Sequence, residues 1–143
     1  MSKVVVISSD AMVGEDLETY KTLPSWQKYF RGGAEITGVS SIYPTVTFPA
    51  HATMMTGMYP DRHGVFSNMQ LIPQADPTPW QWDSGFLTCS DIFRAAKAAG
   101  KTTAAVFWPV TAGNPAIDYH IADYWAQGGD DTTEKAFARA GAS

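Results

Sequence analysis

Four consecutive β-branched residues near the start of the chain constrain its fold most strongly. Residues 4–7 read Val-Val-Val-Ile and are followed by two serines and Asp10. A strand that is apolar on both faces is typical of a parallel sheet covered by helices. The run therefore predicts a buried parallel strand. Asp10 would lie just beyond its carboxyl end, at the edge where open α/β sheets bind ligands.

The rest of the chain alternates between helical and strand-like segments. Prolines, glycines and capping residues predict helices at five places, residues 15–20, 25–30, 49–56, 91–99 and 132–140. Ser25 and Ser90 are the expected caps of two of them. Strands are expected over residues 35–39 and 102–108, a loop over 58–68 and an irregular excursion over 71–85. This order predicts an α/β fold with a doubly wound, mostly parallel sheet and helices on both faces.

Length and composition bound the class of protein. The chain has 143 residues, of which 45% are hydrophobic and 17% charged, which fits one globular domain and excludes a disordered tail. The formal charge of −4 without a basic patch argues against nucleic acid as a partner. A single cysteine, Cys89, excludes an internal disulfide framework. The apolar run at the N-terminus is too short for a signal peptide or a membrane span, so we expect no membrane and a cytoplasmic location.

Three polar residues stand where chemistry could occur. Asp10 follows a predicted strand, Thr47 lies at or just before a predicted helix N-terminus, and Asn68 lies in a loop. A carboxylate can hold a divalent metal, and the helix dipole favours a phosphate group. By pattern alone, Asp10 could equally be a turn residue and Thr47 an ordinary N-cap.

Two neighbouring motifs sharpen this interpretation. Residues 43–53 read Tyr-Pro-Thr-Val-Thr-Phe-Pro-Ala-His-Ala-Thr, and residues 56–65 read Thr-Gly-Met-Tyr-Pro-Asp-Arg-His-Gly-Val. Together they closely resemble the nucleotide pyrophosphatase/phosphodiesterase family of the alkaline phosphatase superfamily. Residues 4–10 resemble the first strand and metal-binding aspartate of that family, and residues 100–109 resemble its strand ending in a Phe-Trp-Pro motif. The resemblance covers most of residues 3–125.

The resemblance implies a function and a set of roles. Thr47 matches the nucleophile that attacks phosphorus, and Asn68 matches the side chain that donates a hydrogen bond to a phosphoryl oxygen. Asp10 and Thr47 match ligands of a site for two divalent metal ions, usually zinc. The implied activity is hydrolysis of phosphodiester or pyrophosphate bonds in a small phosphorylated substrate of nucleotide type.

Aromatic residues around the motif could contact the substrate or belong to the core. Phe48 matches a residue whose ring can pack against the base or leaving group, and a core aromatic is the alternative. Trp108 is expected near the rim of the pocket, as a second substrate-binding candidate. Trp80 and Trp82 could line a cleft or shield a core.

The histidines and the cysteine are expected to be structural. His51 and His63 fall inside the motif, but in the resembled family they are not metal ligands. His51 is interpreted as a helix residue, His63 as one that fixes a loop, and His120 as a loop residue. Cys89 is expected to be a small buried residue rather than a nucleophile.

Other members of the superfamily differ at the nucleophile. A sulfatase needs a Cys or Ser in its own motif, and an alkaline phosphatase uses a serine, whereas this chain has Thr47. Phosphonoacetate hydrolases use a threonine in a related motif, so that activity and phosphomonoesterase activity stay open as alternatives.

The expected metal site is incomplete in this sequence. Asp-x-x-x-His and Asp-His ligand pairs do not follow in residues 110–143. We therefore expect residues 1–143 to be the N-terminal part of one alkaline-phosphatase-like catalytic domain. The alternative function is a catalytically incompetent α/β module. Such a module would bind the missing half, or form a homo-oligomer through an exposed sheet edge or apolar surface.

Overall fold

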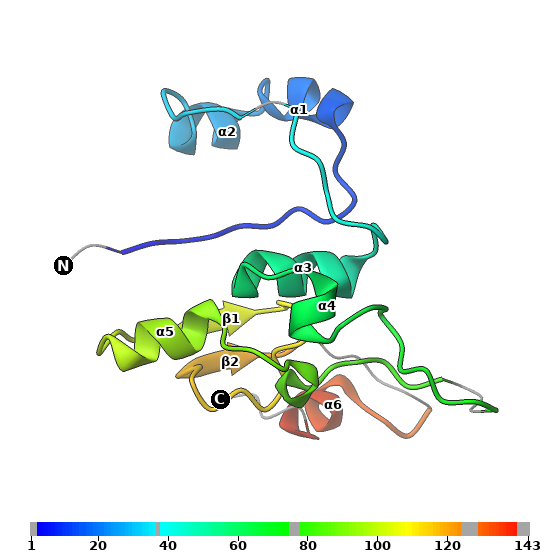
Figure 1. Ribbon diagram of the computed structural model, residues 1–143. Coiled ribbons are helices and arrows are strands. Elements are labelled where there is room, and N and C mark those ends of the chain that lie inside the picture. The colour runs from blue at the N-terminus through cyan, green and yellow to red at the C-terminus, as the bar shows by residue number, and fades with distance from the viewer. Residues whose placement is uncertain (1–2, 37, 75–77, 124–128, 140–143) are drawn as a thin grey trace. The chain divides into compact units, whose positions relative to one another are not determined.

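The computed structural model describes residues 3–36, 38–74, 78–123 and 129–139 and divides the chain into two compact units. The first unit is Met1–Ser40 and the second is Ser41–Ser143. Figure 1 shows the elements of each. The division leaves the motif from Tyr43 onward within the second unit.

The first unit contains two short helices, α1 (Gly14–Tyr20) and α2 (Pro24–Tyr29). In the first turn of α1, the Asp16 carboxylate accepts a hydrogen bond from the Val13 N–H at 3.0 Å. Helix α2 begins at Pro24, because the fixed φ of proline suits the first helical position. Both helices were predicted, but Ser25 lies inside α2 rather than capping it.

The two strands predicted in this unit are not formed. Residues 4–7 are extended, and their side chains are 65–87% exposed instead of buried. Residues 35, 36, 38 and 39 are also outside any strand, and residue 37 is not described. The physical reason is that a strand exists only through hydrogen bonds to a neighbour. Among the described residues, the single ladder with named strands is that between β1 and β2 of the second unit.

The second unit combines helices with a short parallel sheet. Strands β1 (Ala104–Val106) and β2 (Tyr119–Ile121) pair in parallel, with Ala105 opposite His120. The helical elements are α3 (Thr47–Thr56), α4 (Pro60–His63), the 3₁₀ turn η1 (Ser84–Phe86), α5 (Ile92–Ala98) and α6 (Thr133–Arg139). Helix α3 contacts both α4 and α5 (Figure 1).

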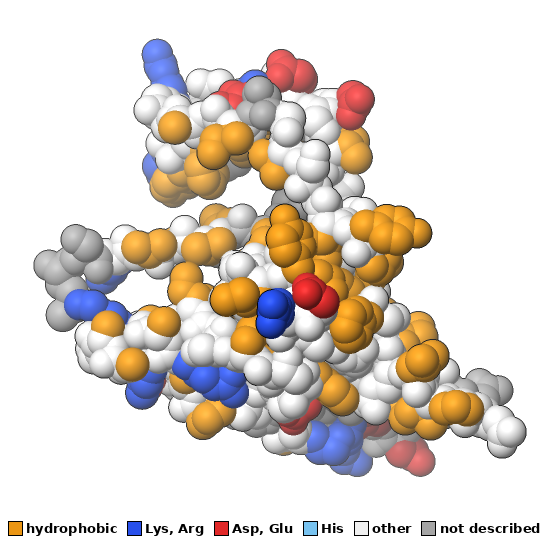
Figure 2. All heavy atoms as spheres, viewed as in Figure 1, with side chains coloured by type: hydrophobic (Ala, Val, Ile, Leu, Met, Phe, Trp, Pro, Cys, Tyr) orange, Lys and Arg blue, Asp and Glu red, His pale blue; other side chains and the backbone are white. Residues whose placement is uncertain are grey.

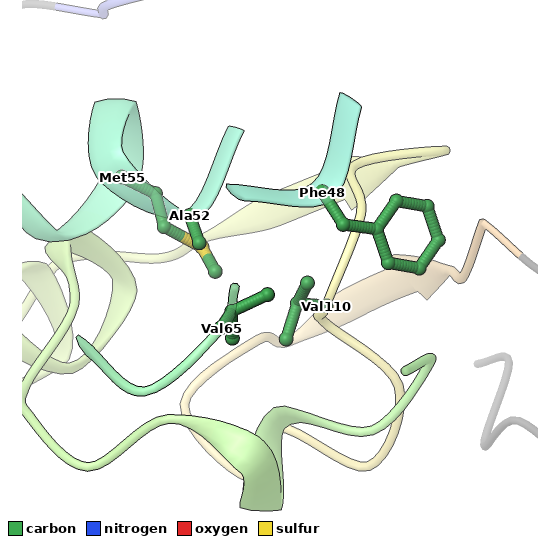
Figure 3. Packing of buried hydrophobic residues seen from close by; sticks show 5 residues of the cluster. All are labelled: Phe48, Ala52, Met55, Val65 and Val110. Carbon is green, nitrogen blue, oxygen red and sulfur yellow. The ribbon is translucent and has the colours of Figure 1, made fainter. Parts of the chain in front are cut away.

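Helix α3 supplies much of the core of this unit. Phe48, Ala52 and Met55 on α3 are buried together with Val65 and Val110. Figure 3 shows Ala52 and Met55 pointing from the helix toward Val65 and Val110. Because burial of each large side chain contributes about 1.5–3 kcal/mol, this cluster anchors α3 along its length to the rest of the unit.

Several boundaries differ from the predictions. Helix α3 begins at Thr47, two residues earlier than expected, and α4 forms a turn inside the predicted loop. Asp91, not Ser90, caps α5, and its carboxylate accepts from the Arg94 N–H at 2.9 Å. Of the strand predicted over 102–108, three residues form β1, and Ala105 alone of these is buried.

The parallel sheet and its helices make this an α/β structure, although large hydrophobic side chains remain on the surface (Figure 2). The larger doubly wound sheet stays a prediction, as does the assignment of residues 1–143 to one domain. Within the described ranges, each helix falls short of the length and apolar character needed to cross a bilayer.

Candidate functional site

Thr47 is the first residue of α3. The preceding residue, Val46, is the N-cap and adopts an extended conformation, while Gly57 ends the helix in the left-handed region at φ 69°. Thr47 is therefore not the cap that the alternative interpretation assumed. The first turn of α3 contains no acidic residue, so the positive end of the helix dipole is not neutralised by its own side chains. Such a position favours a negatively charged group beside Thr47.

Asn68 lies against the same turn. Its side-chain Oδ1 accepts a hydrogen bond from the Phe48 N–H at 2.8 Å. Because a backbone N–H can only donate, this contact assigns the oxygen of the carboxamide, and the Nδ2 amide is the remaining donor. Within residues 3–36, 38–74, 78–123 and 129–139, no hydrogen bond from this Nδ2 is present. The structure thus brings Asn68 to the Thr47–Phe48 peptide, 20 residues after Phe48 in the sequence.

Gln81 holds the loop that carries Asn68. The Gln81 N–H donates to the Asn68 carbonyl at 2.9 Å. Its buried side-chain amide donates to the carbonyls of Ser67 at 3.1 Å and Met69 at 3.0 Å. Gln81 was not among the predicted site residues, because a lone glutamine in an irregular segment carries no signal of which loop it will bind.

His51 and His63 each make hydrogen bonds to neighbouring groups of the fold. The buried His51 ring bonds the Thr47 carbonyl through Nδ1 at 2.8 Å. In His63, Nδ1 accepts from the Val65 N–H at 3.1 Å, so Nε2 carries the proton and donates to Thr53 Oγ1 at 3.0 Å. Burial lowers the pKa of His63, which stabilises this neutral form.

His120 differs from its prediction, since it lies in β2 rather than in a loop. Thr111 Oγ1 donates to the Trp108 carbonyl at 2.6 Å and is 3.0 Å from His120 Nε2. Because the Thr111 hydroxyl donates its proton to Trp108, it can only accept from His120, so His120 Nε2 is the donor in that hydrogen bond. Burial lowers the pKa of His120 as well.

The aromatic candidates pack in or against the core. Phe48 is 1% exposed, and its ring lies 5.3 Å from that of Trp80 and 5.9 Å from that of Trp82. This placement corresponds to the alternative interpretation, a core aromatic, and leaves the ring little surface to offer a substrate. Trp80 and Trp82 stack on each other at 5.6 Å and shield that core. Trp108 is half-buried against the same cluster.

Asp10 and the cysteine complete the set of candidates. Asp10 lies in a turn of the first unit, whereas Thr47 and Asn68 belong to the second, so the metal role of Asp10 and Thr47 stays a prediction. Cys89 is half-buried and precedes α5, in line with a structural residue.

The expected pair of metal ions does not fit the described residues by themselves. In residues 3–36, 38–74, 78–123 and 129–139 no three His, Cys, Asp or Glu side chains are grouped closely enough to hold an ion. Further ligands would have to come from outside those residues.

Comparison of the sequence with protein families identifies a family to which the chain is similar. The family profile described as type I phosphodiesterase / nucleotide pyrophosphatase matches residues 4–140. The chain belongs to that family. The match includes Thr47 and Asn68, the two residues that the structure joins through the Phe48 N–H.

Curated relatives agree with the family assignment. Ectonucleotide pyrophosphatase/phosphodiesterase family member 3 of Rattus norvegicus is 29% identical over 119 residues, which is 74% of this chain and 13% of the relative. A bis(5'-adenosyl)-triphosphatase of Xenopus laevis is 25% identical over 75% of the chain and 24% of its own length. A venom phosphodiesterase of Naja atra is 29% identical over 76% of the chain and 14% of its own length. The chain thus spans 13–24% of the length of these relatives, and no solved structure matches it significantly.

Proposed function

We propose that the chain carries the nucleophile part of a site that hydrolyses phosphodiester or pyrophosphate bonds in small, nucleotide-like substrates. The observation that carries this proposal is the 2.8 Å hydrogen bond from the Phe48 N–H to Asn68 Oδ1. It holds Asn68 beside Thr47, at the positive end of α3. The family assignment and the names of the relatives support the same chemistry.

The positions of the two residues support the roles that we propose for them. Thr47 Oγ1 would attack phosphorus and form a covalent intermediate while the leaving group departs, and water would then release the product. The Asn68 Nδ2 amide would donate to an oxygen on phosphorus as negative charge grows there. Phosphonoacetate hydrolase-like or phosphomonoesterase activity would use the same attack on phosphorus. The choice of a nucleotide-like diester or pyrophosphate as the substrate is therefore a separate part of the proposal.

A second candidate function follows from the finding that the described residues do not form a metal site by themselves. A chain that does not gather its own metal ligands could be an inactive α/β module that self-associates or binds a partner. The exposed β-branched segment of residues 4–7 favours this candidate, because an unpaired apolar segment can add to another sheet edge.

The cytoplasmic location also stays a prediction.

The test is hydrolysis of a nitrophenyl nucleotide ester in the presence of zinc. The parent chain is compared with Thr47→Ala and with the control Thr45→Ala, whose parent hydroxyl donates to the Ile42 carbonyl at 2.9 Å. We expect nitrophenol release by the parent and the control, and only the background rate for Thr47→Ala. Equal rates of nitrophenol release by the parent and Thr47→Ala would refute the assignment of Thr47 as the nucleophile. No release by any correctly folded variant would refute hydrolysis by this chain and favour the second candidate.

A further inference from the structure

The peptide unit between Thr47 and Phe48 is held at both of its polar ends by side chains. Its N–H donates to Asn68 Oδ1 at 2.8 Å, and its carbonyl oxygen is 2.8 Å from His51 Nδ1. A carbonyl can only accept, so His51 Nδ1 carries the proton. His51 and Asn68 thus contact opposite ends of one rigid peptide plane.

This plane directly follows the Cα atom of Thr47. Fixing its orientation fixes ψ of Thr47 and, with it, the direction of the Thr47 side chain relative to the helix. The same plane orients the Asn68 carboxamide, because Oδ1 is committed to the Phe48 N–H. The direction of the Nδ2 amide is set in turn, since the carboxamide group is planar. A shift of the peptide would therefore move both groups of the proposed site together.

His51 is itself restrained from several sides. It is 6% exposed, and its ring meets the Trp108 ring edge-on, with the ring centres 5.2 Å apart. The Trp108 indole N–H donates to the His51 carbonyl at 3.4 Å. Trp108 is anchored through its own carbonyl by Thr111, which in turn accepts from His120 in β2. A continuous series of hydrogen bonds thus joins the sheet to the first turn of α3.

We propose that His51 is a positioning residue for Thr47 and Asn68, acting through the Thr47–Phe48 peptide plane. This inference rests on the proposed function for its catalytic meaning. Its structural content stands on the contacts alone: the Nδ1 donor, and not merely the bulk of the ring, keeps the Phe48 N–H on Asn68.

Two polar substitutions separate a donor in the right place from one that is displaced. His51→Asn retains an amide nitrogen on Cγ, at the position of Nδ1, whereas His51→Gln places it one carbon further out. Amide hydrogen exchange is measured for Phe48, with the buried Ala52 in the middle of α3 as the internal reference. The side-chain amide resonances of Asn68 are recorded in the same samples. None of these measurements requires turnover, so failure of the proposed hydrolysis does not affect them.

We expect Phe48 exchange, relative to Ala52, to be about tenfold faster in His51→Gln than in the parent, and close to the parent in His51→Asn. The Asn68 amide resonances should move only in His51→Gln. Equal Phe48 exchange in both variants, or an equal rise at Phe48 and Ala52, would show that His51 only fills the core and would overturn the proposal. Where the parent hydrolyses the nitrophenyl ester, His51→Gln should lower kcat about tenfold with little change in KM.

Discussion

At the scale of single residues, Asn68 has two ends with different tasks. Its oxygen accepts from the Phe48 N–H, which belongs to the fold, and its Nδ2 amide is the donor that the proposed reaction would use. The sequence placed Asn68 in a loop, and its role was assigned only through the resemblance to a family. The hydrogen bond that holds it could not be predicted, because it joins residues 20 positions apart through the backbone of one of them.

Substitutions at Asn68 can separate these tasks. Asn68→Asp keeps an acceptor for the Phe48 N–H but loses the Nδ2 donor, whereas Asn68→Ala loses both. We expect both variants to lose about a hundredfold in the rate of ester hydrolysis, the usual cost of removing one such donor. Slow hydrogen exchange at Phe48 should survive in Asn68→Asp and disappear in Asn68→Ala. Full activity in Asn68→Asp would exclude the amide as a donor.

The buried histidines predict how stability changes with pH. Burial lowers the pKa of His63 and His120 in the folded chain, so the unfolded chain binds more protons below its ordinary histidine pKa of about 6.5. The free energy of unfolding should therefore fall as the pH drops from about 7.5 to about 5.5. Urea unfolding at several pH values measures this slope. The slope should be smaller in the double variant His63→Gln/His120→Gln, and an unchanged slope would rule these two residues out as its source.

At the scale of elements, helices were predicted well and strands poorly. Helix α3 and its end at Gly57 follow from local signals, namely a proline in the first turn and a glycine in the left-handed region. The segment Val4–Ile7 carries an equally strong local signal but has no ladder in the described structure. Strand formation depends on a distant partner, which composition does not reveal.

The cap of α5 offers a direct test at this scale. Asp91 accepts from the Arg94 N–H at 2.9 Å, and its buried carboxylate also accepts from Asn114 Nδ2 at 3.1 Å. Asp91→Ala should reduce the free energy of unfolding by about 1–3 kcal/mol, from the lost cap and the unpaired Asn114. The control, Ser90→Ala, should change it by less than about 0.5 kcal/mol. Urea unfolding measures both, and the reverse order would restore Ser90 as the cap.

At the scale of the whole molecule, the resemblance to a family named candidate site residues that lie near one another in the second unit. Thr47, Phe48 and Asn68 were each assigned a role through the resemblance, and the Phe48 N–H, one residue after Thr47, donates to Asn68 Oδ1 at the start of α3. Phe48 shows the limit of such transfer, since its ring lies in the core. The hydrophobic character of an aromatic residue does not reveal whether its partners are other side chains or a ligand.

The covalent intermediate on Thr47 is the most direct test of the central claim. The parent chain and Thr47→Ala are incubated with the nitrophenyl nucleotide ester and zinc, quenched in acid during turnover and digested for peptide mass spectrometry. The account predicts a nucleotidyl group on Thr47 of the parent and none anywhere in Thr47→Ala. A nucleotidyl group on another residue, or turnover that continues in Thr47→Ala, would contradict it.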